Sequence, residues 1–266
     1  MGRRFLGIQA FLVYAFLYAP IVIVVVYAFN GGRQTLVWDG FSTRWFGEAL
    51  RDEVIRDALR NSVLVATGNA VVASVLGTML ALALARMRPA VRAPFDALVT
   101  MTLVTPEIVF GIAALVFFVE AGVQLGLGTI LVAHVVFNAS VVALVVRARF
   151  VGMGQSLEEA SYDLGAGPLS TFRQVTLPRL APAILAGGLL AFTFSFDDFY
   201  TSFFVSGAGT TTLPLYIFSS LRFGVSPVVN ATAVIVLGLT LVAVVVAYLV
   251  LRRSDDARAG SGVPGL

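Results

Sequence analysis

The sequence predicts an all-α, polytopic membrane protein with six transmembrane helices, and three observations support this. Of its 266 residues, 58% are hydrophobic and only 12% are charged, whereas a soluble domain carries about a quarter charged residues. Six apolar stretches reach the length of roughly 20 residues that a helix needs to cross a bilayer. Arginines gather at alternate gaps between these stretches, as in multi-pass membrane proteins. The six stretches are Ile8–Phe29, Ser62–Ala85, Asp96–Val119, Thr129–Val146, Ala181–Val205 and Val228–Leu251.

The first three stretches differ in their flanks and in their polar content. The first follows Arg3 and Arg4, and the second ends at Arg86. The third contains Pro106 and Glu107. Since proline removes a backbone hydrogen bond inside a helix, we expect the third helix to be loosened there, with carbonyl groups free for a ligand.

The last three stretches follow the same plan. The fourth ends at Arg147 and Arg149, and the sixth stops at the arginine pair 252–253. The fifth contains two adjacent acids, Asp197 and Asp198. No arginine lies inside any of the six stretches.

The distribution of arginine predicts the orientation. One set of termini and loops collects twelve arginines: Arg3, Arg4, Arg86, Arg88, Arg92, Arg147, Arg149, Arg173, Arg179, Arg252, Arg253 and Arg258. The opposite set holds Arg222 and five arginines in the 30–60 loop, where five acids balance them. Because arginine-rich loops stay in the cytoplasm, both termini are predicted to be cytoplasmic.

The composition also excludes several functions. The chain has no cysteine, so a disulfide or a thiolate metal site cannot form. All eighteen basic residues are arginine, and the lysine of a P-loop is therefore missing. We therefore expect no cofactor to be bound by this chain.

A polar stretch between the fourth and fifth spans is predicted to form two short helices on the cytoplasmic side. Ser156 and Glu159 have the spacing of a capping box, which starts a helix. Gly165 suits the left-handed residue that ends one. Pro168 fits the first turn of a second helix running toward Val175, which Leu177-Pro178 is expected to close.

This stretch resembles the EAA loop of ABC importer permeases of type I, the MetI-like class. From Glu159 to Pro178 it reads E-A-S-Y-D-L-G-A-G-P-L-S-T-F-R-Q-V-T-L-P, which matches E-A-A, three residues, G, nine residues and I-x-L-P, with Ser161 and Val175 as small departures. The resemblance implies a loop that docks in a groove of the ATPase and transmits its closure to the spans. The residues that it would assign to this coupling are Glu159, Ala160, Asp163, Gly165, Leu177 and Pro178. The alternative is an amphipathic loop lying on the lipid surface.

Three acids at membrane depth are the candidate substrate residues, because a carboxylate there is costly unless it is paired or wetted. At about 1.5 Å per residue, Glu107 lies roughly 17 Å from the cytoplasmic start of its span, and Asp197 roughly 24 Å up the fifth. We therefore expect two levels of negative charge along one route. Thr193 and Ser195 are each expected to share a helix face with one carboxylate of the pair Asp197 and Asp198. The alternative is that the acids hydrogen-bond within the protein and never meet substrate.

Further motifs resemble the spermidine/putrescine permeases of the PotC type over nearly the whole chain. They are Tyr18-Ala19-Pro20-Ile21, Pro106-Glu107-Ile108, Phe194-Ser195-Phe196-Asp197-Asp198, Leu213-Pro214-Leu215 and the 225–231 run V-S-P-V-V-N-A. The resemblance implies import of polyamines by alternating access, with Trp45 and Ser195 as further substrate or gate positions. Trp45 has the alternative role of an aromatic at the membrane interface. The implied partners are a PotB-like second permease subunit, a PotA-like ATPase dimer and a PotD-like extracytoplasmic polyamine-binding protein.

The predicted organisation has three parts. Residues 1–56 hold the first span and an extracytoplasmic amphipathic segment, which is expected to be helical from Phe41 to Leu59. Residues 57–251 form the permease core, which includes the coupling loop at about 152–179, and residues 252–266 form a disordered tail. Leu213–Phe223 is expected to be a short outer helix, and His134 a hydrogen-bonded core residue.

Other functions remain open from the sequence alone. The same scaffold could carry another cationic amine, an amino compound, ferric ion or thiamine. An intramembrane aspartyl protease is disfavoured because Asp163 falls in the cytoplasmic loop and adjacent aspartates cannot face each other as a dyad. A self-sufficient carrier would usually show inverted halves, and none is visible.

Overall fold

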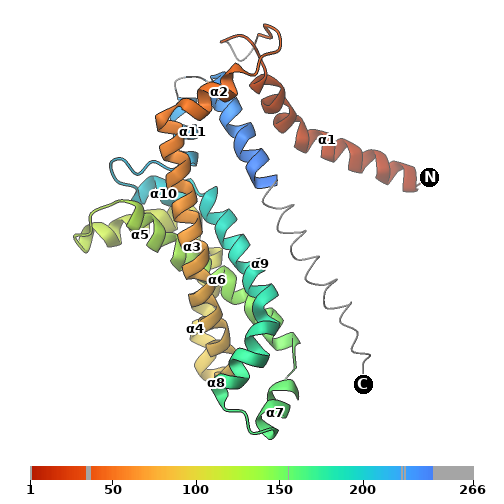
Figure 1. Ribbon diagram of the computed structural model, residues 1–266, viewed down its shortest axis with the longest axis vertical. Coiled ribbons are helices and arrows are strands. Elements are labelled where there is room, and N and C mark those ends of the chain that lie inside the picture. Colours follow the sequence, from red (N-terminus) through yellow and green to blue (C-terminus); the bar gives the residue numbers. More distant parts are fainter. Residues whose placement is uncertain (1, 34–36, 155, 223, 225, 242–266) are drawn as a thin grey trace. The chain divides into compact units, whose positions relative to one another are not determined.

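The computed structural model describes residues 2–33, 37–154, 156–222, 224 and 226–241, and these are helical with short connections (Figure 1). No strand occurs among them beyond one isolated bridge between Asn30 and Phe41. The chain divides into two compact units, Met1–Arg56 with Ile217–Leu266, and Asp57–Tyr216. The predicted tail and the end of the sixth span, from residue 242 on, lie outside the described residues.

The first unit contains α1 (Gly2–Ala28), α2 (Arg44–Arg51) and a helix at Pro227–Leu241. Their packing centres on Ala28, Trp45 and Ala231, which are buried together. The amphipathic segment is not the single helix that the sequence predicted. It breaks at Asp52, whose Oδ1 accepts the backbone N–H of Val54 at 2.8 Å and so begins a new helix.

The second unit is built on three long helices that cross closely: α3 (Glu53–Arg86), α6 (Leu127–Gly152) and α9 (Leu177–Phe196). Glycine permits the close approach. A Cβ at Gly77 would lie 2.7 Å from the carbonyl oxygen of Ala139, and one at Gly187 would lie 3.2 Å from Val142. These small residues therefore let α3 and α9 pack closely against α6.

The third predicted span is broken. The structure has α4 (Pro89–Val104) and α5 (Glu107–Glu120), bent by 109° at Thr105 and Pro106. The loosening expected at Pro106 is thus a sharp break within the stretch Asp96–Val119. Pro106 explains the break. Proline has no N–H to continue the helical hydrogen bonds, and it forces the backbone of the preceding residue out of the helical conformation. Glu107 consequently stands in the first turn of a new helix.

The fifth predicted span is broken as well. Helix α9 ends at Phe196, Asp197 and Asp198 lie in a short non-helical segment, and α10 (Tyr200–Val205) follows. The stretch Ala181–Val205 is therefore not one continuous helix. Helices α5 and α10 pack against each other, and Gly111 lets them meet, since a Cβ there would lie 3.2 Å from the carbonyl oxygen of Tyr200.

At its other end the fifth span begins earlier than predicted. Helix α8 (Pro168–Thr171) runs through a π-helical turn, η1 (Phe172–Thr176), directly into α9. Leu177-Pro178 therefore does not close the second short helix. Pro178 is tolerated because it stands in the first turn of α9.

The described residues include four helices long and apolar enough to span a membrane, or five with the bent pair α4 and α5. Pro227–Leu241 is a shorter apolar helix that covers the described part of the sixth stretch. This count is compatible with six spans. The predicted short outer helix is confirmed as α11 (Leu213–Leu221).

Candidate functional site

The two helix breaks place Glu107 and Asp198 on the wall of one cavity. The cavity opens to solvent, and its empty volume of about 350 Å³ includes part of that open space. Helices α5, α6, α9 and α10 and the segment between α9 and α10 contribute its wall. The lining residues are Glu107, Phe110, Ala133, His134, Phe137, Asn138, Phe194, Asp198 and Thr201. The described lining thus combines two carboxylates with three phenylalanine rings and contains no arginine.

Glu107 and Asp198 line the same cavity, while the expected arrangement of Glu107 and Asp197 at two levels stays a prediction. The sequence estimate assumed straight helices, whereas the bend at Pro106 redirects the chain before Glu107. The adjacent acids also separate. Asp198 lines the cavity, but Asp197 is the exposed residue that caps the end of α9, where its backbone N–H donates to the carbonyl of Thr193 at 3.1 Å.

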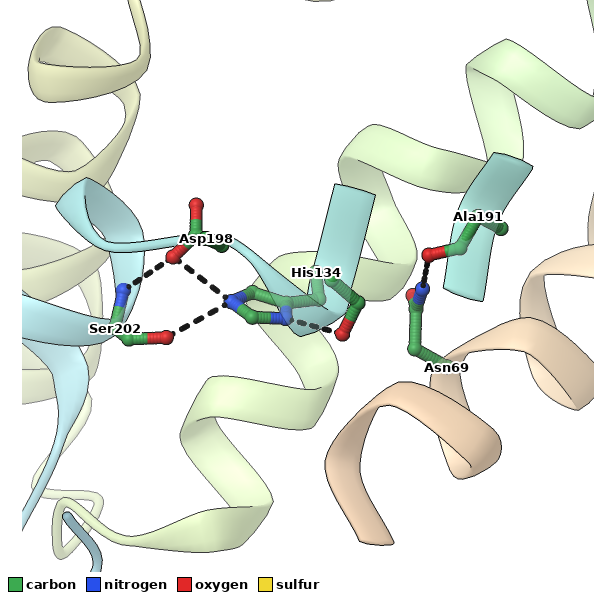
Figure 2. Close-up of polar contacts among 6 residues, drawn as sticks. Asn69, His134, Ala191, Asp198 and Ser202 are labelled. Carbon is green, nitrogen blue, oxygen red and sulfur yellow. Dashed lines mark hydrogen bonds and ion pairs between the residues drawn. The ribbon is translucent and has the colours of Figure 1, made fainter. Parts of the chain in front are cut away.

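His134 holds one side of the Asp198 carboxylate, as Figure 2 shows. The ring is 3% exposed. Its Nε2 lies 3.2 Å from Asp198 Oδ1 and 3.2 Å from Ser202 Oγ, and its Nδ1 lies 2.7 Å from Ser195 Oγ. The prediction of a hydrogen-bonded core histidine is confirmed.

The chemistry of these partners assigns the protons. A carboxylate can only accept, so the Nε2–H of His134 donates to Asp198. In the neutral ring Nδ1 then accepts the hydroxyl proton of Ser195. The two hydroxyls that were expected to share a helix face with the carboxylates bond other groups: Ser195 bonds His134, and Thr193 donates to the carbonyl of Leu189 at 3.0 Å.

Ser195 contacts His134, and its contact with substrate stays a prediction. It is buried and is not among the described residues that line the cavity. One turn earlier, the carbonyl of Ala191 accepts a hydrogen bond of 2.8 Å from the side-chain amide of Asn69 in α3 (Figure 2). Sequence reasoning missed the contact from His134 to Asp198 because 64 residues separate them and no local spacing signals it.

Asp198 also starts α10. Its Oδ1 accepts the backbone N–H of Ser202 at 2.8 Å, so the carboxylate satisfies one of the free donors at the start of that helix. The side chain is 11% exposed. Asp198 is therefore fixed on one side by His134 and Ser202, and this contact orients the group toward the cavity.

The predicted coupling loop has the expected shape. Helix α7 runs from Ser156 to Asp163, and Gly165 takes the left-handed conformation with φ of +83°. The backbone N–H of Gly165 and Ala166 donate to the carbonyls of Tyr162 and Ser161, which closes the helix end. Pro168 opens α8 as predicted.

The loop is tied to the spans through Glu158. One carboxylate oxygen of Glu158 accepts the hydroxyl of buried Thr176 at 2.5 Å and lies 3.9 Å from the guanidinium of Arg86 at the end of α3. In Figure 1, α7 and α8 accordingly lie at the end of the unit where α3 finishes. Sequence reasoning did not single out Glu158.

The residues assigned to coupling by resemblance face outward. Glu159, Ala160, Asp163, Gly165, Leu177 and Pro178 are all exposed. Leu164 beside them is an apolar side chain that is 89% exposed. The assignment of these six residues to an ATPase contact stays a prediction.

Trp45 is buried within its own unit. Its indole N–H donates to the carbonyl of Asn30 at 2.7 Å, and the ring packs with Ala28 and Ala231. The guanidinium of Arg44 lies over the ring, 4.0 Å from its centroid. These contacts satisfy the polar atom of the indole and give Trp45 a packing role, while its contact with substrate stays a prediction.

Comparison with known proteins identifies the class of this chain. Residues 54–255 match the model of a family described as the binding-protein-dependent transport system inner membrane component. The chain belongs to this family. It is thus a permease subunit of the ABC importer class, a multi-pass membrane component that works with ATPase subunits and a substrate-binding protein. This membership disfavours the other two classes considered from the sequence, an intramembrane aspartyl protease and a self-sufficient carrier.

Two relatives and one solved structure show how close the similarity is. The permease is 41% identical to the Escherichia coli K12 putrescine transport system permease protein PotI, over 92% of this chain and 90% of that protein. It is 36% identical to the E. coli K12 spermidine/putrescine transport system permease protein PotC, over 98% of both chains. A bacterial ABC transporter that imports the acidic polysaccharide alginate has the same fold, with a TM-score of 0.68, 20% identity and coverage of 94% and 96%.

Proposed function

We propose that this permease passes polyamines, putrescine or spermidine, into the cytoplasm by alternating access. The observation that carries the proposal is the cavity that Glu107 and Asp198 line together with Phe110, Phe137 and Phe194. Carboxylates attract the ammonium groups of a polyamine, and aromatic rings accept both its methylene chain and its charge. The similarity to PotI and PotC, which are named for transport of putrescine and spermidine, supports the same cargo.

Helix ends add to the preference for cations. The last carbonyls of α9 have no helical partner at the break before Asp197, and a helix carries partial negative charge at its carboxyl end. Broken helices in transporters use such ends to coordinate cations. An anionic solute would meet like charge throughout this region, which disfavours it.

The complete transporter is proposed to contain four kinds of subunit. This permease pairs with a PotB-like permease, a PotA-like ATPase dimer binds ATP and Mg²⁺, and a PotD-like protein delivers the polyamine from outside. The coupling loop, 152–179, docks on the ATPase, and both termini lie in the cytoplasm. Helices α5 and α10 pack together beside the cavity, so a movement passed from the loop to α9 would reach the acids.

Reconstitution tests the cargo. The complex of both permeases and the ATPase, in proteoliposomes with its binding protein, would be offered radiolabelled putrescine, spermidine, a neutral amino acid and an anionic one. ATP-dependent uptake of the two amines, with no uptake of the anionic solute, is the expected result. Uptake confined to neutral or anionic solutes would overturn the proposal.

A further inference from the structure

The cavity contains one buried amide whose purpose the fold does not explain. Asn138 lies in α6, one turn after His134, and lines the same cavity as Glu107 and Asp198. It is 2% exposed. Its Oδ1 has no hydrogen-bond partner among the residues that the structure describes. Because buried polar groups are nearly always paired, an unpaired amide on a cavity wall indicates a missing partner.

Comparison with the other unpaired buried groups separates Asn138 from them. Asn69 Oδ1 is also unpaired among the described residues, but its Nδ2 donates to the carbonyl of Ala191 and the residue holds α3 against α9. The hydroxyl of Thr78 is unpaired in the same sense. The remaining two such atoms are Arg92 Nε and Thr212 Oγ1. Of these five residues, only Asn138 belongs to the described lining of the cavity, beside the acids.

The chemistry of the wall suggests the partner. The amide of asparagine can turn its oxygen or its NH₂ toward the cavity. Beside two carboxylates, a ligand that the site attracts is a cation, and a cation with N–H groups presents donors to the amide oxygen. A primary ammonium group has three N–H donors, and Glu107, Asp198 and Asn138 together supply three acceptor side chains.

We propose that Asn138 is a substrate-contacting residue that accepts a hydrogen bond from an alkylammonium group held between Glu107 and Asp198. The proposal rests on the polyamine function and adds how the site recognises its cargo. The carboxylates provide the charge, and the amide recognises an N–H in a defined direction. Phe110, Phe137 and Phe194 enclose the attached methylene chain.

The division of roles along α6 follows from the contacts. His134 makes three hydrogen-bond contacts, with Asp198, Ser195 and Ser202. Asn138, four residues later, lies on the same helix face and keeps its amide oxygen unpaired among the described residues. One turn of α6 therefore both fixes the anionic group and contributes a neutral acceptor next to it.

The test compares Asn138→Leu with Asn138→Asp in the whole reconstituted transporter. Leucine has a similar size and removes both polar atoms, whereas aspartate keeps an acceptor oxygen at the same place. Thr78→Val is the matched control, because it also removes an unpaired buried polar group from the same unit. The readouts are putrescine uptake per ATP hydrolysed, with saturating loaded binding protein, and the melting temperature of the complex.

We expect Asn138→Leu to lower uptake per ATP by roughly 10-fold to 100-fold, the range for a lost hydrogen bond to a charged group. Its melting temperature should stay the same or rise, since leucine replaces an unpaired polar group. Asn138→Asp should retain most of the uptake, and Thr78→Val should match the parent chain. Normal uptake per ATP by Asn138→Leu would overturn the role of Asn138.

The same experiment separates this inference from the proposed function. If the parent complex takes up putrescine and Asn138→Leu does so equally well, polyamine transport stands and the contact of Asn138 fails. If the parent complex moves no amine, the polyamine function itself fails. A loss of uptake together with a large fall in melting temperature would also contradict the proposal, because it would assign Asn138 to the fold.

Discussion

Replacing Asp198 with asparagine should separate charge from shape in the cavity. The amide oxygen of the Asp198→Asn variant can still accept the N–H of Ser202 and the Nε2–H of His134, the two contacts of 2.8 Å and 3.2 Å that fix this side chain. We therefore expect the start of α10, and the assembly of the transporter, to be preserved. Only the attraction for a cation should be lost.

The size of the loss can be worked out from Coulomb's law. An ammonium about 4 Å from a carboxylate gains about 4 kcal/mol at an effective dielectric constant of about 20. The cavity is open to solvent, and water screening should leave about half of this, about 2 kcal/mol, which corresponds to a roughly 30-fold fall in putrescine uptake. Uptake per transporter in proteoliposomes is the assay, with binding of the ATPase as the check on assembly.

Asp197→Asn is the matched control for this prediction. It removes the same charge one residue earlier, at an exposed position that is not part of the described cavity lining. We expect it to reduce uptake less than Asp198→Asn. Equal uptake by Asp198→Asn and the parent chain, or a larger loss from Asp197→Asn, would refute the assignment of Asp198 to the cavity.

Three more predictions test other parts of the account. His134→Leu should lower uptake because it removes a hydrogen bond that holds Asp198. The double variant, His134→Leu with Asp198→Asn, should therefore show uptake only slightly below that of Asp198→Asn alone. Additive losses of uptake would contradict a shared role. Glu158→Gln weakens the contacts of α7 with Thr176 and Arg86. ATP hydrolysis should continue while uptake per ATP falls. Unchanged uptake per ATP would argue against a role of these contacts in coupling. Gly77→Val should lower the yield of folded complex, because its Cβ would meet the α6 backbone 2.7 Å away; a normal yield and melting temperature would count against close packing of α3 and α6.

Local signals in the sequence predicted the coupling loop almost residue by residue. The helix start at Ser156, the left-handed turn at Gly165 and the proline start at Pro168 each depend on one residue and its neighbours. Such signals work because capping and turn preferences act over three or four residues. They failed at Leu177-Pro178, where a π-helical turn carries the helix through.

The site needed information that the sequence does not carry. The helical period treats a span as straight, so the break at Asp197 and the 109° bend before Glu107 could not be placed. Pro106 indicated that the helix would be weakened there, but not the direction in which it would bend. The contact of His134 with Asp198 joins residues 64 apart, and only packing of α6 beside the end of α9 brings them together.

Protection of a thiol inside the cavity tests the central claim most directly. The chain has no cysteine, so a Phe194→Cys variant carries one thiol on the cavity wall, at a position that is now 45% exposed. In the reconstituted complex this thiol would be reacted with a cationic methanethiosulfonate, and the label on this chain counted by mass spectrometry. If a polyamine occupies the cavity between Glu107 and Asp198 during transport, putrescine with ATP and binding protein should slow the labelling. Labelling at the same rate with and without putrescine during active uptake would contradict passage through this cavity.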